Sequence, residues 1–349
     1  MREISLGGQR QIGKDHPPLL IAEIGQNHCG SISLAHLYIE EAARCGMDAV
    51  KFQTHIASAE STRDEVFRGP PPSGYEKRTR FEYWQRMEFS TQDWHELAEH
   101  VRAEGLYFLS SVFSHEAFAL IETVNPDAWK IASGEVGSAG LIGRMAVTNK
   151  PILISTGMST TADIDEALVQ LDQVSASYAL LQSTSLYPTP LSRVGLNVLD
   201  EWRTRYQCPV GLSDHTGTVW APLEAMSRGV DLIEVHVILD KRITTPDTPV
   251  SLTFTEAAWL AAAREAHEEL KKPLDKSNLP EDIAEIQRLF ARSLALTHDC
   301  PAGTVISNSL LVEKKPGTGI PPDAKDQIVG RRLARSVRVD ELLHWDDLE

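Results

Sequence analysis

Short apolar runs and helical segments alternate along most of this chain, and that alternation limits the folds the chain can adopt. Eight times between Leu19 and Leu270, an apolar run of four or five residues is followed by a stretch with helical spacing. Strands that alternate with helices are typical of parallel sheets covered by helices. The sequence therefore predicts an α/β fold, and eight units in about 250 residues predict a closed (β/α)8 barrel.

The expected elements can be given by residue number. The predicted strands span residues 19–23, 48–52, 106–109, 128–131, 151–154, 178–181, 209–212 and 231–235. The predicted helices span residues 33–45, 91–104, 115–124, 140–147, 161–171, 194–205, 219–228 and 254–270. A doubly wound open sheet is the alternative, but its glycine-rich fingerprint is missing after the first strand. Residues 57–90, which include GPPPSG, predict an irregular insertion after the second strand.

Composition divides the chain into three segments. Residues 1–270 form the predicted barrel domain, and residues 271–284, beginning KKPLDKSNLP, predict a linker. Residues 285–349 contain short apolar runs separated by PAGTV and KKPGTGIPP, which predict a small β-rich domain. A domain of about 65 residues has a thin core. We therefore expect it to pack on the barrel or on a neighbouring chain.

The overall charge and composition exclude several classes of partner. The formal net charge is −15, which argues against nucleic acid and against anionic membranes as partners. The N-terminal segment MREISLGGQRQIGKDHPP lacks the apolar core of a signal peptide, so we expect a cytoplasmic protein.

The four cysteines have no spacing typical of a metal site or a disulfide framework, which favours reduced thiols. They are Cys29, Cys45, Cys208 and Cys300.

Two histidines follow neighbouring predicted strands near the end of the barrel. His215 comes shortly after PVGL and His236 directly after DLIEV, with a predicted helix between them. Parallel strands end at the same face of a barrel, so both imidazoles should emerge there. Two neutral imidazoles at one place can bind a divalent metal ion. The alternative is that they are two unrelated polar residues at strand ends.

Two lysines lie in apolar strand contexts, in AVKF and AWKI. Burying Lys51 or Lys130 in such a strand is costly unless the ammonium group meets an anion. Several Ser and Thr residues follow the other predicted strands, and cationic groups with hydroxyls suit a phosphate or carboxylate. This pattern favours an anion site at the carboxyl ends of the strands. The alternative is that each lysine lies at the surface with its ammonium in water.

Seven motifs in order resemble those of one enzyme family. They are AEIGQNHCG, DAVKFQT, KIASGE, STGMS, STSLYPTP, GLSDHT and EVHVILD. Together they resemble the sialic acid synthase family, which includes N-acetylneuraminate, legionaminate and pseudaminate synthases and spore-coat polysaccharide synthesis proteins. AGTVISNSLLVEKK and KKPGTGI resemble the antifreeze-like domain of that family, also called the SAF domain. The resemblance covers nearly the whole chain.

The resemblance implies a reaction and a set of residues for it. The family condenses phosphoenolpyruvate with an open-chain N-acyl amino sugar, such as N-acetylmannosamine or a 2,4-diamino hexose, and releases phosphate. The resemblance implies a catalytic set of Glu23, Lys130, His215 and His236, with Glu23 as the acid/base group. It implies Mn²⁺, with Mg²⁺ or Co²⁺ as alternatives, bound by His215 and His236. The residues implied for phosphoenolpyruvate are Lys51, Lys130, Ser133, Ser155, Ser185 and Ser213.

The resemblance also implies sugar-binding residues and an assembly. Gln53, Glu135, Tyr187 and Asp247 would contact the sugar. Lys315 stands where the family has a substrate-contacting arginine in the small domain. A lysine there lacks the planar fork with which arginine binds two acceptors. In the family, the SAF domain of one subunit covers the active site of the other in a domain-swapped homodimer.

Two other functions remain open for a barrel with these residues. One is a Schiff-base aldolase with Lys130 or Lys51 as nucleophile, although such an enzyme does not need the histidine pair. The other is a non-catalytic relative that only binds sugar. The presence of Glu23, both lysines and both histidines argues against it.

Overall fold

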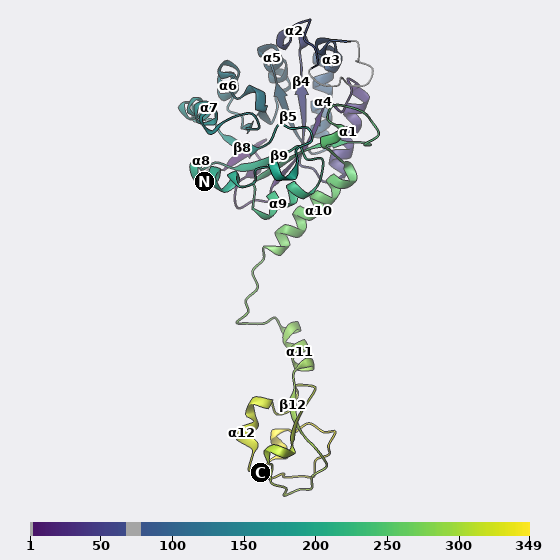
Figure 1. Cartoon of the computed structure of the whole chain (residues 1–349), viewed down its shortest axis with the longest axis vertical. Coiled ribbons are helices and arrows are strands. Elements are labelled where there is room, and N and C mark those ends of the chain that lie inside the picture. The colour runs from purple at the N-terminus through teal and green to yellow at the C-terminus, as the bar shows by residue number, and fades with distance from the viewer. Residues whose placement is uncertain (1–2, 68–77) are drawn as a thin grey trace. The chain divides into compact units, whose positions relative to one another are not determined.

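A computed structural model describes residues 3–67 and 78–349 of the chain and divides it into two compact units. The first unit is Met1–Lys271 and the second is Lys272–Glu349 (Figure 1). The GPPPSG segment, residues 69–74, lies outside the described residues. No helix of the described part is long and apolar enough to cross a membrane.

The first unit is a closed barrel of eight parallel strands. Hydrogen-bonded neighbours follow chain order from β3 to β10, and β10 pairs with both β9 and β3, which closes the sheet. The predicted (β/α)8 fold is thereby confirmed. A ninth strand, β11 (Ser251–Thr253), pairs parallel with the last three residues of β10. The barrel strands are β3 (Leu19–Gly25), β4 (Ala49–Thr54), β5 (Tyr107–Val112), β6 (Ala128–Ile131), β7 (Ile152–Ser155), β8 (Tyr178–Gln182), β9 (Val210–Asp214) and β10 (Leu232–Ile238).

Helices surround the barrel, each packing an apolar stripe against the outer face of the strands (Figure 1). Helices α5 and α10 have the predicted bounds, whereas α8 begins four residues later than predicted, because Gly195 in the predicted first turn has a left-handed backbone with φ +75°. The outer helices are α1 (Ile32–Arg44), α4 (Thr91–Ala103), α5 (His115–Val124), α6 (Ala139–Ala146), α7 (Thr161–Gln173), α8 (Val198–Tyr206), α9 (Trp220–Ser227) and α10 (Phe254–Leu270).

The prediction of an irregular insertion at residues 57–90 is wrong in part. Helix α2 (Ala57–Glu60) follows β4, and helix α3 (Arg80–Met87) precedes α4. A capping box starts α3: the Thr79 side chain accepts from the backbone of Glu82, and the Glu82 side chain accepts from the backbone of Thr79. Tyr83, Trp84 and Met87 on α3 form a small buried cluster with Ala57 on α2.

An N-terminal hairpin that the sequence analysis did not predict closes the amino end of the barrel. Strand β1 (Ile4–Leu6) pairs antiparallel with β2 (Arg10–Ile12). Their apolar side chains join the inner cluster of the barrel, which is formed by every second residue of the strands. The other members of this cluster are Leu19, Ile21, Ala49, Leu109, Ala128, Leu153, Ala179, Leu181 and Leu232.

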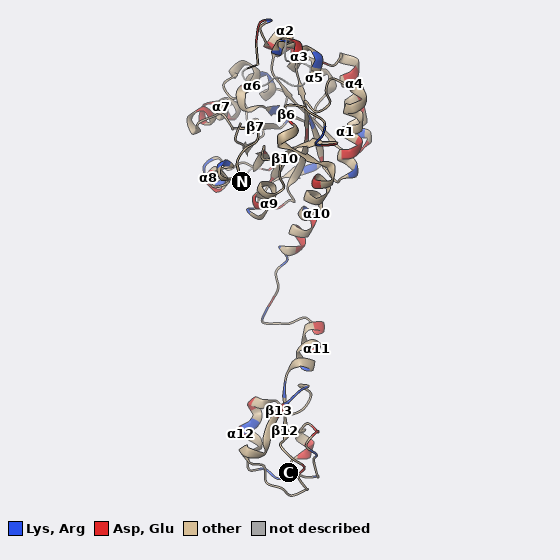
Figure 2. Cartoon of the chain, turned by 45° about the vertical axis from the view of Figure 1, so that its right-hand side comes forward, with Lys and Arg blue, Asp and Glu red and all other residues tan. Residues whose placement is uncertain are grey.

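The second unit has a small core of its own. Helix α11 (Glu281–Phe290) comes first, so the last four residues of the predicted linker belong to a helix. It carries acidic residues in its first turn and a basic residue in its last (Figure 2). Strands β12 (Ser293–Leu296) and β13 (Leu311–Lys314) pair antiparallel, and α12 (Lys325–Ile328) follows. Apolar residues between Leu294 and Leu348 form the core of this small domain.

Replacing Leu6 by Ala tests the role of the hairpin. Leu6 is fully buried in the inner cluster, so Leu6→Ala should lower the free energy of unfolding by about 2–5 kcal/mol. Urea denaturation measures this change. Leu270→Ala is the control, because Leu270 is 83% exposed and its truncation should change stability by less than about 0.5 kcal/mol. Equal effects of the two changes would contradict the packing described for the hairpin.

Candidate active site

A pocket of about 640 Å³ opens at the carboxyl ends of the barrel strands. It brings together thirteen of the fourteen site residues predicted from the sequence; the remaining one, Lys315, belongs to the second unit. Segments far apart in the chain therefore meet in one place. The thirteen residues are Glu23, Lys51, Gln53, Lys130, Ser133, Glu135, Ser155, Ser185, Tyr187, Ser213, His215, His236 and Asp247.

The two-residue period of the strands explains why these side chains point inward. Leu19 and Ile21 of β3 face the barrel interior, so Glu23 two residues later does so too. The same step leads from Ala49 of β4 to Lys51. Most strands thus contribute apolar residues to the inner core and then polar residues to the pocket. Ser111, Lys130, Ser155, Ser213, Glu234 and His236 follow the same rule on their own strands.

Two lysines and two glutamates form a buried charged network at the bottom of the pocket. Lys51 Nζ lies 2.7 Å from Glu23 Oε2 and 3.6 Å from Glu234 Oε1. Lys130 Nζ donates to both oxygens of Glu234, at 2.9 and 2.8 Å. The Ser213 hydroxyl donates to Glu234 Oε1 at 2.9 Å. All four charged side chains are at most 4% exposed, so each depends on its partners for compensation.

The network shifts the ionisation of its members in different directions. Burial lowers the pKa of Lys51, but its attraction to Glu23 and Glu234 outweighs burial and the net shift is upward. Burial lowers the pKa of Lys130 to about 8, because Glu234 compensates only in part. Burial raises the pKa of Glu234, but Lys130 and Lys51 outweigh it and hold the value at about 2. Glu234 is therefore an anion at neutral pH.

Serine hydroxyls surround Gly157 beside this network. A Cβ atom built on Gly157 would lie 2.5 Å from the Oγ atoms of Ser183 and Ser185 and 3.0 Å from that of Ser133, so only glycine leaves this space open. The buried Ser155 hydroxyl has no hydrogen-bond partner among the described residues. Buried hydroxyls are normally paired. This group of hydroxyls beside two ammonium groups is suited to bind an anion.

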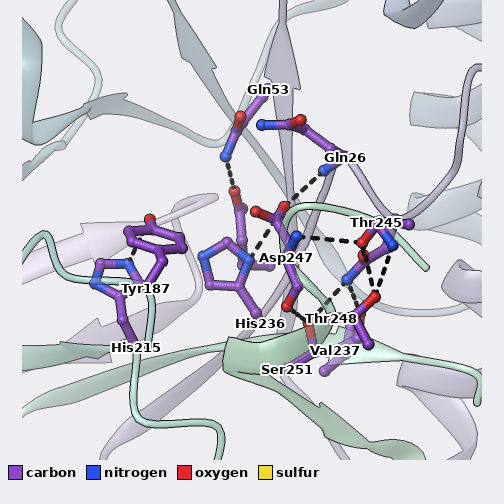
Figure 3. Close-up of polar contacts among 12 residues, drawn as sticks. Gln26, Gln53, Tyr187, His215, His236, Val237, Thr245, Asp247, Thr248 and Ser251 are labelled. Atoms are coloured by element: carbon purple, nitrogen blue, oxygen red, sulfur yellow. Dashed lines mark hydrogen bonds and ion pairs between the residues drawn. The ribbon is translucent and has the colours of Figure 1, made fainter. Parts of the chain in front are cut away.

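His215 is held as a neutral imidazole by hydrogen bonds on both ring nitrogens. Its Nδ1 lies 3.1 Å from the Thr184 carbonyl oxygen, which can only accept, so Nδ1 carries the hydrogen. Nε2 therefore accepts from the Tyr187 hydroxyl, at 3.0 Å. Burial, followed by the nearby His236, lowers the pKa of His215 to about 3. Figure 3 shows the Tyr187 ring beside that of His215, with a centroid distance of 4.5 Å, on the side that faces His236.

His236 is oriented by a carboxylate on its other side (Figure 3). Its Nδ1 lies 3.5 Å from Asp247 Oδ2, which also accepts from the backbone N–H of Gln26 at 3.0 Å. Burial lowers the pKa of His236, but Asp247 outweighs burial and the net shift is upward. Gly25 has φ +52°, and a Cβ there would lie 2.5 Å from Asp247 Oδ2. Gly25 therefore allows Asp247 to approach the histidine.

The two imidazoles have the chemistry of metal ligands. Their ring centroids are 5.4 Å apart. Metal-binding histidines are usually held by a hydrogen bond or carboxylate on the nitrogen that does not bind the metal, as Thr184 and Asp247 hold these two rings through Nδ1. On His215, a cation at Nε2 would take the place of the Tyr187 hydroxyl. Within residues 3–67 and 78–349, no three His, Cys, Asp or Glu side chains are grouped to hold a metal ion. A cation bound here would have His215 and His236 as its protein ligands.

The sequence analysis missed several residues of the pocket. Glu234 was overlooked, although it stands two residues before His236 on the same strand and so faces the same interior. In the loop after β3, Gln26 lines the pocket, whereas the Asn27 side chain donates to the Val237 carbonyl and to Ser251 Oγ. The outer wall is also new, and its residues come from the insertion and from the end of β5: His55, Glu60, Ser61, Glu65, Arg80, Trp84 and Phe113.

Comparisons with known proteins agree with the architecture of both units. The model of the NeuB family matches residues 38–274, and the model of the SAF domain matches residues 291–349. A crystal structure of a spore coat polysaccharide biosynthesis protein from Bacillus subtilis is similar, with a TM-score of 0.66 and 26% identity. The match covers 100% of this chain and 99% of the Bacillus subtilis chain.

Three curated relatives are similar over almost their whole length. An uncharacterized protein of Methanocaldococcus jannaschii is 31% identical, covering 100% of this chain and 99% of the relative. The N,N'-diacetyllegionaminic acid synthase of Legionella pneumophila is 32% identical, covering 99% and 98%. The pseudaminic acid synthase of Campylobacter jejuni is 29% identical, covering 97% and 100%.

Proposed function

Because the chain belongs to the NeuB family, we propose that it is a synthase of a nonulosonic acid, which condenses phosphoenolpyruvate with an open-chain N-acyl amino sugar and releases phosphate. The observation that carries this proposal is the pocket itself. Two lysines, a group of serine hydroxyls and a histidine pair line one cavity at the carboxyl ends of the strands. The reaction needs a site for a phosphorylated anion next to a site for a polarised aldehyde.

The lysines and serines are the proposed site for phosphoenolpyruvate. Lys51 and Lys130 offer two ammonium groups to its carboxylate and phosphate, and the unpaired hydroxyl of Ser155 offers a further hydrogen bond. Ser133 and Ser185 line the same pocket and approach each other closely over Gly157, where only glycine avoids a clash with their hydroxyls, so they are further proposed donors to the anion. These contacts would orient carbon 3 of phosphoenolpyruvate towards the sugar.

Glu23 is the proposed acid/base group. After carbon 3 forms the new bond to the aldehyde carbon, positive charge develops at carbon 2 of the former phosphoenolpyruvate and a water molecule adds there. Glu23 lines the pocket and its Oε2 lies 2.7 Å from Lys51 Nζ, so its carboxyl group is placed beside the proposed phosphoenolpyruvate site, where it would accept the proton of this water. The resulting tetrahedral intermediate releases phosphate by C–O cleavage and leaves the keto acid.

His215 and His236 are the proposed ligands of a divalent cation, Mn²⁺ or alternatively Mg²⁺ or Co²⁺. Such a cation, when bound, would act as a Lewis acid on the aldehyde oxygen of the sugar. Gln53, Glu135, Tyr187 and Asp247 line the same pocket and are the proposed contacts of the sugar. N-acetylmannosamine or a related 2,4-diamino hexose is the proposed sugar substrate.

A Schiff-base aldolase is the second candidate, because burial lowers the pKa of Lys130 to about 8 and so favours an amine nucleophile. The contacts of Lys130 argue against this mechanism. Both oxygens of Glu234 accept from its ammonium group, and Glu234 is the anionic partner that holds the proton there. Borohydride reduction in the presence of substrate distinguishes the mechanisms, since only a Schiff base leaves a covalent adduct on lysine.

The second unit has an apolar helix face that its own domain leaves uncovered. On α11, Ile283, Ile286, Leu289 and Phe290 are between 44% and 66% exposed, and their spacing places them along one side of the helix. An exposed apolar stripe of this kind usually marks a protein contact. We propose a homodimer in which the second unit of one protomer covers the pocket of its partner.

Phosphate release tests the proposed function. The chain with phosphoenolpyruvate and a panel of N-acyl amino sugars should release phosphate only when both a sugar and Mn²⁺ are present. His215→Ala and His236→Ala should each reduce turnover at least about a hundredfold, because the Lewis acid is lost. His36→Ala, outside the pocket, is the matched control. Full turnover in strong chelator would contradict the metal site, and no phosphate release with any sugar would contradict the function.

Calorimetric titration with phosphoenolpyruvate tests the two lysines. Lys51→Met and Lys130→Met each remove a charge-assisted contact, typically worth about 1.5–3 kcal/mol, so affinity should fall about ten- to a hundredfold. Each change also leaves a carboxylate less well compensated, so thermal unfolding must show that the variant is folded. Lys276→Met, on an exposed residue, is the control. Unchanged affinity in both folded variants would refute the anion site.

Truncation and substitution test the second unit. Light scattering should give a homodimer for the full chain. A chain ending at Pro280 should keep a folded barrel, which has its own core, but lose most turnover. Lys315→Ala should raise the KM for the sugar and leave phosphoenolpyruvate affinity nearly unchanged, whereas Lys276→Ala should change neither. A fully active truncated monomer would show that the second unit does not cover the pocket.

A further inference from the structure

A chain of hydrogen bonds runs from Glu23 to the outer wall of the pocket. Glu23 Oε1 accepts from Gln53 Nε2 at 2.7 Å. Gln53 Oε1 lies 3.3 Å from His55 Nε2, and His55 Nδ1 lies 2.7 Å from Glu60 Oε1. The proposed acid/base carboxylate is thus connected to a second carboxylate through an amide and an imidazole.

The chemistry of these groups determines where the hydrogens lie. The Gln53 amide donates to Glu23 through its nitrogen, so its oxygen is the atom that faces His55. An amide oxygen can only accept, so His55 Nε2 must carry a hydrogen. One further proton then lies between His55 Nδ1 and Glu60 Oε1. The His55–Glu60 pair therefore has no net charge, whether that proton is on the ring or on the carboxyl group.

Aromatic packing fixes the plane of the His55 ring. Trp84 stacks on one face with a centroid distance of 4.0 Å and an interplanar angle of 18°. Phe113 stacks against the ring at 4.5 Å and 5°. The His55 side chain is only 4% exposed, and that of Glu60 only 9%. The ring is therefore held in one orientation, in which Nε2 faces Gln53 and Nδ1 faces Glu60.

Glu60 has few other partners in this arrangement. Its second carboxylate oxygen, Oε2, is buried and has no hydrogen-bond partner among the described residues. A buried carboxylate without other donors depends on its one strong contact. Within the described part of the chain, that contact is the one to His55 Nδ1.

We propose that His55 and Glu60 are positioning residues that act through Gln53 on Glu23. An amide side chain can turn over and exchange its nitrogen and oxygen, and only the orientation with nitrogen towards Glu23 stabilises the carboxylate form. The N–H of His55 Nε2 selects that orientation, and Glu60 keeps this hydrogen in place by holding the other side of the ring. The catalytic consequence rests on the proposed function, in which Glu23 accepts a proton from water.

A spectroscopic test does not depend on turnover. In chain labelled with ¹⁵N-histidine, the Nε2 signal of His55, assigned by its loss in His55→Phe, should be that of a nitrogen bearing hydrogen. Glu60→Leu removes the only group that shares a proton with Nδ1 in the described part of the chain, so the Nδ1 signal should shift. A His55 Nε2 without hydrogen in the unaltered chain would overturn the proposal.

A kinetic test separates positioning from folding. His55→Phe keeps a ring between Trp84 and Phe113 but removes both nitrogens, and Glu60→Leu removes the partner that holds Nδ1. Each should lower kcat about tenfold to a hundredfold, with phosphoenolpyruvate affinity changed by less than about twofold. His55→Gln, whose amide N–H can replace Nε2–H, should recover most of the loss. His36→Phe, a histidine on the outer helix α1, is the control.

A double variant tests whether the effect passes through Gln53. Because His55 acts on Glu23 only through this amide, His55→Phe with Gln53→Leu should have the same kcat as Gln53→Leu alone. The proposal would be overturned if the kcat losses of the two single variants multiplied in the double variant, or if folded His55→Phe had an unchanged kcat. If the unaltered chain turned over no amino sugar, the proposed function would fail, while the nitrogen signals would still decide whether the hydrogen-bond chain exists.

Discussion

The pocket depends on the mutual compensation of two buried lysines and two buried glutamates. Moving an isolated charge from water into a barrel interior costs several kcal/mol, so none of the four would be stable there alone. Glu234 is the centre of the arrangement, since it accepts from Lys130 and Ser213 and also faces Lys51. An anionic ligand would have to share the ammonium groups with these carboxylates, which explains why neutral hydroxyl donors lie beside them.

The barrel was predictable because each of its units repeats the same local pattern. Apolar runs such as YALL and PVGL are long enough to form strands buried on both faces. The amphipathic segments between them are typical of helices that cover such a sheet. The N-terminal hairpin and helices α2 and α3 were not predictable in this way. Strands of three residues and a helix of four carry too few positions to show a period. The hairpin is stabilised by its contacts with the inner core of the barrel, and α2 by its contacts with α3.

Much of the pocket could be foreseen from where each strand ends. The rule of two residues per period would also have identified Glu234, since His236 was recognised and Glu234 shares its side of β10. The His55 stack could not be foreseen. It needs Trp84 from α3 and Phe113 from the end of β5, and no periodic pattern connects these to β4. The same holds for Gln26, which lines the pocket in place of its neighbours because the loop after β3 turns at Gly25.

The inner cluster of the barrel has a consequence for how the chain is made. Its members extend from Ile4 in the hairpin to Leu232 in the last barrel strand. On the ribosome, the hairpin therefore emerges long before the strand that completes the core around it, and its apolar side chains must wait for more than two hundred residues of synthesis. The second unit draws its core from one contiguous stretch at the end of the chain. Nascent chains of this protein are thus exposed to chaperones mainly while the barrel is incomplete, whereas the second unit can form its core as soon as its own segment has left the ribosome.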